Sequence, residues 1–72
     1  MIQIRVEHGT RHISTEVEEG TTVRDVISNP NFKAILVFDN VHAFVNGVRA
    51  SENQVLEDGD VVKLQASAHT KN

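Results

Sequence analysis

Two histidines, His8 and His12, are the residues of this sequence whose type and spacing come nearest to a metal site. A separation of four residues places two imidazole rings on the same face of a helix. Here the pair flanks Gly9-Thr10, a turn signal between two stretches in which apolar and polar residues alternate, so the spacing has no such meaning. We therefore predict no metal site and no bound cofactor.

The remaining reactive side chains form no recognisable catalytic motif. Cysteine is absent, and none of the serines lies in a nucleophile elbow. The acidic residues of Glu57-Asp58-Gly59-Asp60 lack the spacing of a calcium-binding loop and are explained by a turn. The glycine pattern and lysine of a phosphate-binding loop are also missing. We predict no catalytic residue and no enzymatic activity.

The composition is that of a small acidic protein. The 72 residues carry a net charge of −3 and no cysteine, so a hydrophobic core must stabilise the fold without disulfides. No apolar stretch approaches the ~20 residues that cross a bilayer. The acidic balance disfavours nucleic acid as a partner. We expect a cytoplasmic protein that contacts neither membrane nor nucleic acid.

The first half of the sequence predicts a hairpin followed by a helix. Residues 2–7 alternate between apolar and polar types, and the same two-residue period resumes after the turn at Gly9-Thr10. Thr22 and Asp25 have the spacing of a capping box, in which each side chain accepts a hydrogen bond from the other residue's backbone amide. A helix should begin there, and Asn29-Pro30 should break or restart it.

The second half predicts a further hairpin and a last strand. The segment Phe32–Phe38 suits either a helical face or a buried strand, and we favour a short helix. After the alternating segment Val41–Val45, the dipeptide Asn46-Gly47 predicts a tight turn, because both residues tolerate positive φ. Asp58-Gly59-Asp60 predicts another turn before the final strand.

Two of these turn segments resemble a known family. Val45-Asn46-Gly47 and the L-x-D-G-D-x-V pattern of Leu56–Val62 are similar to segments of ubiquitin-like β-grasp proteins, and Gly20–Ile27 resembles the start of the family helix. The groups concerned are the small sulfur carriers, namely the thiamine sulfur carrier and the small subunit of molybdopterin synthase, and the TGS domains. The resemblance implies an α+β fold, a β-grasp roll with a mixed sheet of four to five strands packed on one main helix. It implies one domain over residues 1–66 and a flexible C-terminal tail over 67–72.

The tail decides between the functions that the resemblance implies. In the sulfur carriers the terminal carboxylate is adenylated and converted to a thiocarboxylate, and two terminal glycines let the tail enter a narrow active site. Here Lys71 and Asn72 stand at those positions, and no two glycines of the sequence are adjacent. We therefore expect a noncatalytic protein-interaction module, an adaptor, inhibitor or assembly factor. The alternatives are a sulfur carrier or a divergent relative, and a TGS-like RNA-contacting regulatory domain.

A binding surface is predicted on the face of the sheet that turns away from the core. Since successive side chains of a strand take opposite faces, Phe44 must face outward if Ala43 and Val45 face inward. An exposed phenylalanine with polar neighbours is typical of a contact surface for another protein, whose identity the sequence does not give. The oligomeric state stays open, because an exposed strand edge accepts a second copy or a different chain. The predicted protein-binding residues are His42, Phe44, Lys63 and Gln65.

Overall fold

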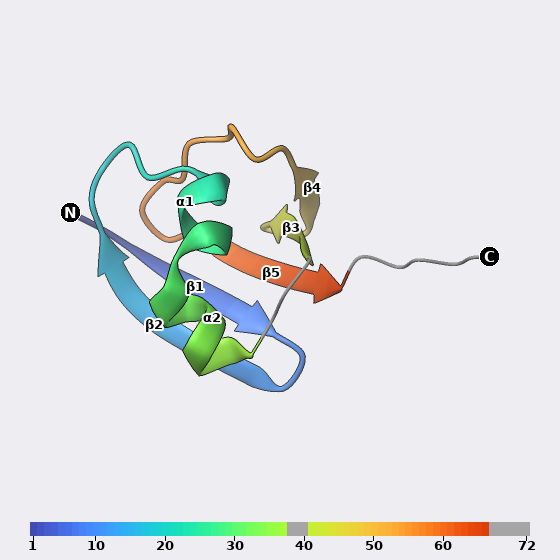
Figure 1. Cartoon of the computed structure of the whole chain (residues 1–72). Coiled ribbons are helices and arrows are strands. Elements are labelled where there is room, and N and C mark those ends of the chain that lie inside the picture. Colours follow the sequence, from blue (N-terminus) through green and yellow to red (C-terminus); the bar gives the residue numbers. More distant parts are fainter. Residues whose placement is uncertain (38–40, 67–72) are drawn as a thin grey trace.

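A five-stranded mixed sheet with two short helices on one face makes up residues 1–37 and 41–66, the part of the chain that this computed structural model describes (Figure 1). The strand order is β2-β1-β5-β3-β4, with β1 and β5 parallel and all other neighbours antiparallel. This is an α+β fold. The elements are β1 (Ile2–His8), β2 (Arg11–Val17), α1 (Val23–Ser28), α2 (Pro30–Leu36), β3 (Val41–Val45), β4 (Val48–Ala50) and β5 (Val61–Ala66).

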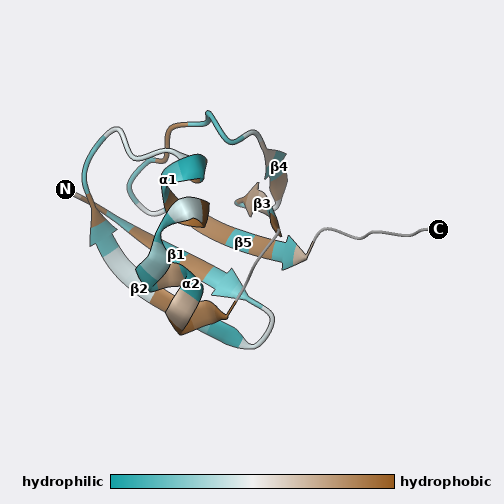
Figure 2. Ribbon diagram, viewed as in Figure 1, coloured by the Kyte–Doolittle hydropathy of each residue, from teal (hydrophilic) through white to brown (hydrophobic). Residues whose placement is uncertain are grey.

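The core lies between the helices and the face of the sheet that they cover. Alternation along β1 turns its apolar residues inward, so that Val6 has no exposed surface, and the hydropathy colours alternate in the same way along β5 (Figure 2). No described helix covers the opposite face, which we call the outer face. The buried residues that the helices contribute are Val23, Val26, Phe32 and Leu36.

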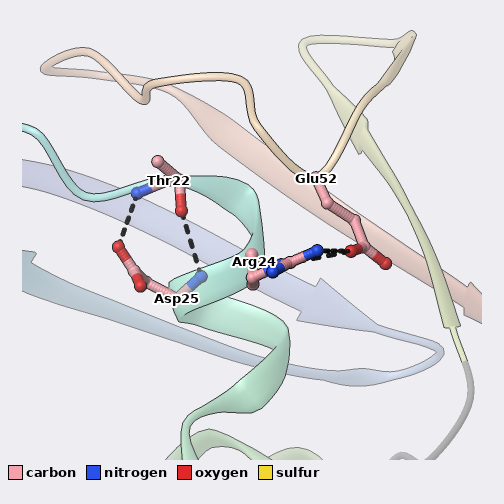
Figure 3. A network of polar contacts seen from close by, with 4 residues as sticks. All are labelled: Thr22, Arg24, Asp25 and Glu52. Atoms are coloured by element: carbon pink, nitrogen blue, oxygen red, sulfur yellow. Dashed lines mark hydrogen bonds and ion pairs between the residues drawn. The ribbon is translucent and has the colours of Figure 1, made fainter.

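The start of α1 is held by a capping box and by the loop that follows β4 (Figure 3). The Thr22 hydroxyl accepts a hydrogen bond from the Asp25 amide at 3.3 Å, and the Asp25 carboxylate accepts one from the Thr22 amide at 3.0 Å. The Arg24 amide donates to the Glu52 carbonyl, and the two side chains form an ion pair at 3.1 Å. The predicted helix start is therefore confirmed.

The helical layer consists of two short helices instead of the one main helix expected from the family. Asn29 has an extended backbone (φ −75°, ψ 119°) that ends α1, and its side chain accepts from the Asn31 amide at 2.8 Å to begin α2. Pro30 occupies the first turn of α2, where its missing N–H is harmless. The helix favoured for the following segment is confirmed as far as Leu36, whereas Phe38 lies outside the described residues.

The strands form where the sequence places them. The hairpin of β1 and β2, the tight turn between β3 and β4, and the final strand β5 are all present. Residues 67–72, predicted as a flexible tail, lie outside the described residues. Neither described helix has the length and apolar composition needed to cross a membrane.

Val37 ends α2 in the left-handed region, with φ 53° and ψ 66°. A β-branched side chain is strained there, at a cost of about 1–2 kcal/mol, because its Cβ crowds the following carbonyl. The side chain is 60% exposed, so burial compensates little of this cost. The end of α2 is therefore a local weak point in the fold.

Replacing this residue by glycine should stabilise the protein. Val37→Gly removes the strain and should raise the free energy of unfolding by about 0.5–1 kcal/mol, after allowance for the greater freedom of the unfolded chain. Ile35→Gly is the matched control, because Ile35 is also exposed but lies inside the helix, where glycine should cost about 1 kcal/mol. Urea unfolding measures both variants. Equal destabilisation by the two changes would contradict the left-handed conformation.

Candidate functional site

Strand β5 leads to the C-terminal tail and lies at the centre of the sheet, between β1 and β3. Its start is fixed from both sides. On one side the Arg5 amide donates to the Asp60 carbonyl at 3.0 Å, and on the other the Asn46 amide donates to the Val61 carbonyl at 2.8 Å. The register of the whole strand follows from these first contacts.

The side chains of Asn46 and Asp60 connect the turn between β3 and β4 to the start of β5. Asn46 has a left-handed backbone (φ 54°), and its Nδ2 donates to Asp60 Oδ1 at 2.9 Å while its Oδ1 accepts from the Val61 amide at 3.0 Å. The second oxygen of Asp60 accepts from the Glu57 amide at 2.8 Å. Asp60 is only 9% exposed, and these partners offset the cost of burying its carboxylate.

The neighbouring loop residues attach the same turn to β1. The Gly59 amide donates to the Gln3 carbonyl at 2.7 Å, and Asp58 Oδ1 accepts from the Gln3 amide at 2.8 Å. Gly59 has φ 87°, a conformation that disfavours any residue with a Cβ. The two segments that carry the family resemblance thus meet in space, and together they place β5.

Exchanging the two polar side chains tests this contact. Asn46→Asp replaces the Nδ2 donor by a carboxylate oxygen opposite Asp60 Oδ1, and it should lower the free energy of unfolding by about 2 kcal/mol or more. The double variant Asn46→Asp, Asp60→Asn should recover most of that loss, because the amide introduced at position 60 donates to the carboxylate introduced at position 46. Chemical denaturation of the single and double variants measures the coupling. Purely additive losses would show that the two side chains do not interact.

The register of β3 and β5 brings the four predicted binding residues together on the outer face. His42 lies opposite Gln65, and Phe44 lies opposite Lys63. His42 and Phe44 are half-buried, whereas Lys63 and Gln65 are exposed. The outward position of Phe44 is confirmed, while the binding of a protein there stays a prediction.

Two charged residues that sequence reasoning missed complete this face. Arg49 on β4 lies opposite Phe44, and its Nη2 is 3.1 Å from Nδ1 of His42. Glu7 on β1 lies opposite Lys63. The position of Arg49 could have been predicted from the turn at Asn46-Gly47, because a two-residue turn fixes which residues of a hairpin face each other. The position of Glu7 opposite Lys63 could not be predicted from neighbouring residues, since it depends on the parallel pairing of distant strands.

The carboxylate of Glu7 is held in its charged form. A side-chain hydrogen bond from Arg5, with Nε 2.5 Å from Glu7 Oε2, is the main cause that lowers the pKa of Glu7, and the charges of Arg5, Lys63 and His12 act in the same direction, against the effect of burial. The Arg5 side chain is 42% exposed, so the pair contributes little to stability.

Three of the four predicted binding residues line two clefts. One of about 240 Å³ lies at the end of β5 and includes the predicted residues Lys63 and Gln65. A larger one of about 470 Å³ lies between α1 and the hairpin of β3 and β4, with His42 and Arg49 among its lining residues. Phe44 is among the lining residues of neither cleft.

The other singled-out residues do not join this surface as a group. His8 and His12 lie on opposite faces of the sheet, because His8 Nδ1 contacts the Leu36 carbonyl on the helix side and His12 lies opposite Glu7 on the outer face. Their spacing therefore does not bring the two rings together. Arg24 lies on α1, where it forms its ion pair with Glu52, and it is not part of the outer face.

Comparison with known proteins identifies the fold. No protein-family model and no curated protein matches this chain. A solved structure from Pyrococcus furiosus, described as a putative molybdopterin converting factor, subunit 1, is similar to it with a TM-score of 0.73 and 25% sequence identity, over 94% of this chain and 100% of that chain. The chain has the ubiquitin-like β-grasp fold. The resemblance to the small sulfur carriers is thereby confirmed.

The expectation of a noncatalytic adaptor, inhibitor or assembly factor is wrong. The chain matches a structure described as a putative molybdopterin converting factor subunit, and this match favours the alternative interpretation over the adaptor. That expectation rested on the bulk of Lys71 and Asn72, two positions outside the described residues. The likeness to the solved structure extends over 94% of the chain.

Proposed function

We propose that this chain is a small sulfur carrier of the molybdopterin-synthase type, or a divergent relative of one. The observation that supports the proposal is the match of nearly the whole chain to a molybdopterin converting factor subunit. The central position of β5, directly before the C-terminal segment, is consistent with it. In this function the protein is not an enzyme but the substrate of one, and it delivers a sulfur atom.

The reacting group is the carboxylate at the C-terminal end of the chain. One of its oxygens attacks the α-phosphorus of ATP on a separate adenylating enzyme, which forms an acyl adenylate and releases pyrophosphate. A sulfide then attacks the acyl carbon, the bond to the phosphate oxygen breaks, and AMP leaves. The product is a thiocarboxylate, and no oxidant or reductant is needed.

The fold supplies a fixed origin for the reacting segment. Ala66, the last residue of β5, pairs with Val41 on β3, and the start of the same strand is held by the contact of Asn46 with Asp60. Ala66, the last described residue, is therefore held at a constant position relative to the outer face. A partner that binds the face meets the start of the reacting segment at a defined position, and holding reactants in place favours transfer.

The outer face is the docking surface in this proposal. Phe44 provides an apolar anchor, and Lys63 and Arg49, opposite it on the two neighbouring strands, provide a charged border. His42 and Gln65 extend the surface toward the end of β5. The partner that fits is a protein, the adenylating enzyme, with an apolar recess and acidic groups around it.

Lys71 and Asn72 are the point at which the sequence departs from the sulfur carriers. Glycines leave the channel of an adenylating enzyme free of Cβ atoms, whereas these two residues bring in a charged stem and a polar branch. An adenylating enzyme that acts on a chain ending in these two residues needs a channel that admits side chains. This requirement makes the two positions the natural place for a matched variant.

Thiocarboxylate formation tests the proposal. The chain is incubated with an adenylating enzyme of the molybdopterin system, ATP and sulfide, and its intact mass is measured. We expect an ATP-dependent mass gain equal to the replacement of oxygen by sulfur, and a higher yield from the variant Lys71→Gly, Asn72→Gly. Modification of that variant alone, or of neither protein, would contradict the proposed function.

The same reaction tests the docking surface. Phe44→Asp should abolish the modification, because it places a charge at the apolar centre, while circular dichroism shows that the fold is retained. Val55→Asp is the matched control, because Val55 is 54% exposed but lies outside the sheet. If Phe44→Asp reacts as fast as the unchanged protein, the outer face is not the docking surface, although the carrier function stands.

A further inference from the structure

Strand β2 is a long, regular edge of the sheet. It pairs with β1 in an unbroken antiparallel register from Ile2 opposite Val17 to His8 opposite Arg11, and within the described residues β1 is the only strand beside it. The strand contains no proline and its register shows no bulge, two of the devices by which proteins protect an edge. Such an edge is able to accept another strand.

The hydrogen bonds of β1 show which backbone groups of β2 face outward. The Arg5 amide and the Gln3 carbonyl both bond to the segment that leads into β5, so the odd-numbered residues of β1 direct their backbone groups toward β5. Backbone directions alternate along a strand, so Ile4 and Val6 direct theirs toward β2. Their partners on β2 are Thr15 and Ile13.

The residues of β2 between these partners must then turn their backbone groups away from β1. They are His12, Ser14 and Glu16, and all three are exposed. Each offers an N–H donor and a C=O acceptor at the open edge. These backbone groups are spaced evenly on both sides of Ser14. A histidine lies two residues before Ser14 and a glutamate two residues after it.

We propose that β2 pairs antiparallel with β2 of a second copy of this chain, about a twofold axis at Ser14. In this register Ser14 lies opposite the partner's Ser14, and His12 lies opposite the partner's Glu16. The two serines exchange a pair of backbone hydrogen bonds, and so does each histidine with the glutamate across from it. The result is one continuous sheet through both copies.

The side chains favour a second copy over an unrelated strand. By symmetry the imidazole of His12 meets the carboxylate of Glu16 twice, and no like charges lie directly opposite in the pairs of the outer face. On the helix side, Ile13 lies opposite the partner's Thr15. Ile13 and Val17 are only partly buried at the margin of the core, and the added strand covers them further.

The dimer leaves the proposed docking surface open. Phe44 and Lys63 lie on β3 and β5, away from the β2 edge. The second copy extends the sheet only beyond β2. In the joined sheet the two copies of β5 are separated by five strand spacings, or roughly 24 Å. The inference does not rest on the sulfur-carrier function, since it follows from the edge alone.

Sedimentation equilibrium of the full chain, from micromolar to millimolar concentration, tests the pairing. The unchanged protein should form a dimer within that range, whereas Ser14→Pro should stay monomeric. Proline removes the central donor of the interface, and in the single copy this N–H faces solvent, so the fold is retained and circular dichroism checks it. A monomer throughout the range, or a dimer that tolerates Ser14→Pro, would overturn the proposal.

The effect of charge substitutions on the dimer affinity gives a second and more specific test of the register. His12→Lys should strengthen the dimer several-fold, because the new cation lies opposite the partner's Glu16. In a Glu16→Lys background the same His12→Lys change should weaken the dimer by about tenfold, because like charges then meet across the axis. An effect of the same sign in both backgrounds would contradict this register.

In a sample that mixes labelled and unlabelled chains, NMR should show an intermolecular contact between the Hα atoms of Ile13 and the partner's Thr15. Contacts through another strand instead would refute the pairing.

Discussion

The placement of β5 depends on the contact between the side chains of Asn46 and Asp60. The amide of Asn46 bonds to the buried carboxylate and, through its oxygen, to the first amide of β5, so one side chain connects a turn, a loop and a strand. Because a one-residue slip of β5 would exchange its inner and outer faces, this contact protects both the core and the outer surface. A polar cluster of a few atoms therefore determines what the sheet presents to a partner.

Local features of the sequence predicted most of the fold. The two-residue period, the capping residues Thr22 and Asp25, and the Asn46-Gly47 dipeptide act over neighbouring residues, and each formed the element expected. Pairings between distant segments were not predictable in this way. The position of Glu7 opposite Lys63 requires knowing that the first and last strands are parallel neighbours, and Val37 is a residue type that argues against the conformation it adopts.

The expectation of an adaptor was wrong because it gave more weight to the residue types at two tail positions than to the resemblance over the rest of the chain. The sheet is consistent with the proposed roles: the inner face forms the core, the outer face around Phe44 is the proposed docking surface, and β5 precedes the proposed reacting segment. The edge strand β2 is the proposed contact with a second copy. The proposed docking surface lies on β3 and β5, whereas the proposed dimer contact lies on β2, so the two can be tested by separate substitutions.

Amide hydrogen exchange followed by NMR tests most directly whether the contact of Asn46 with Asp60 fixes β5. The amides of Arg5, Asn46 and Val61 should exchange only when the whole protein unfolds, with the same opening free energy as the buried Val6 and as chemical denaturation. If Asn46 and Val61 exchange through a much smaller local opening while Val6 stays protected, the contact does not hold the strand, and the central position of β5 must have another cause.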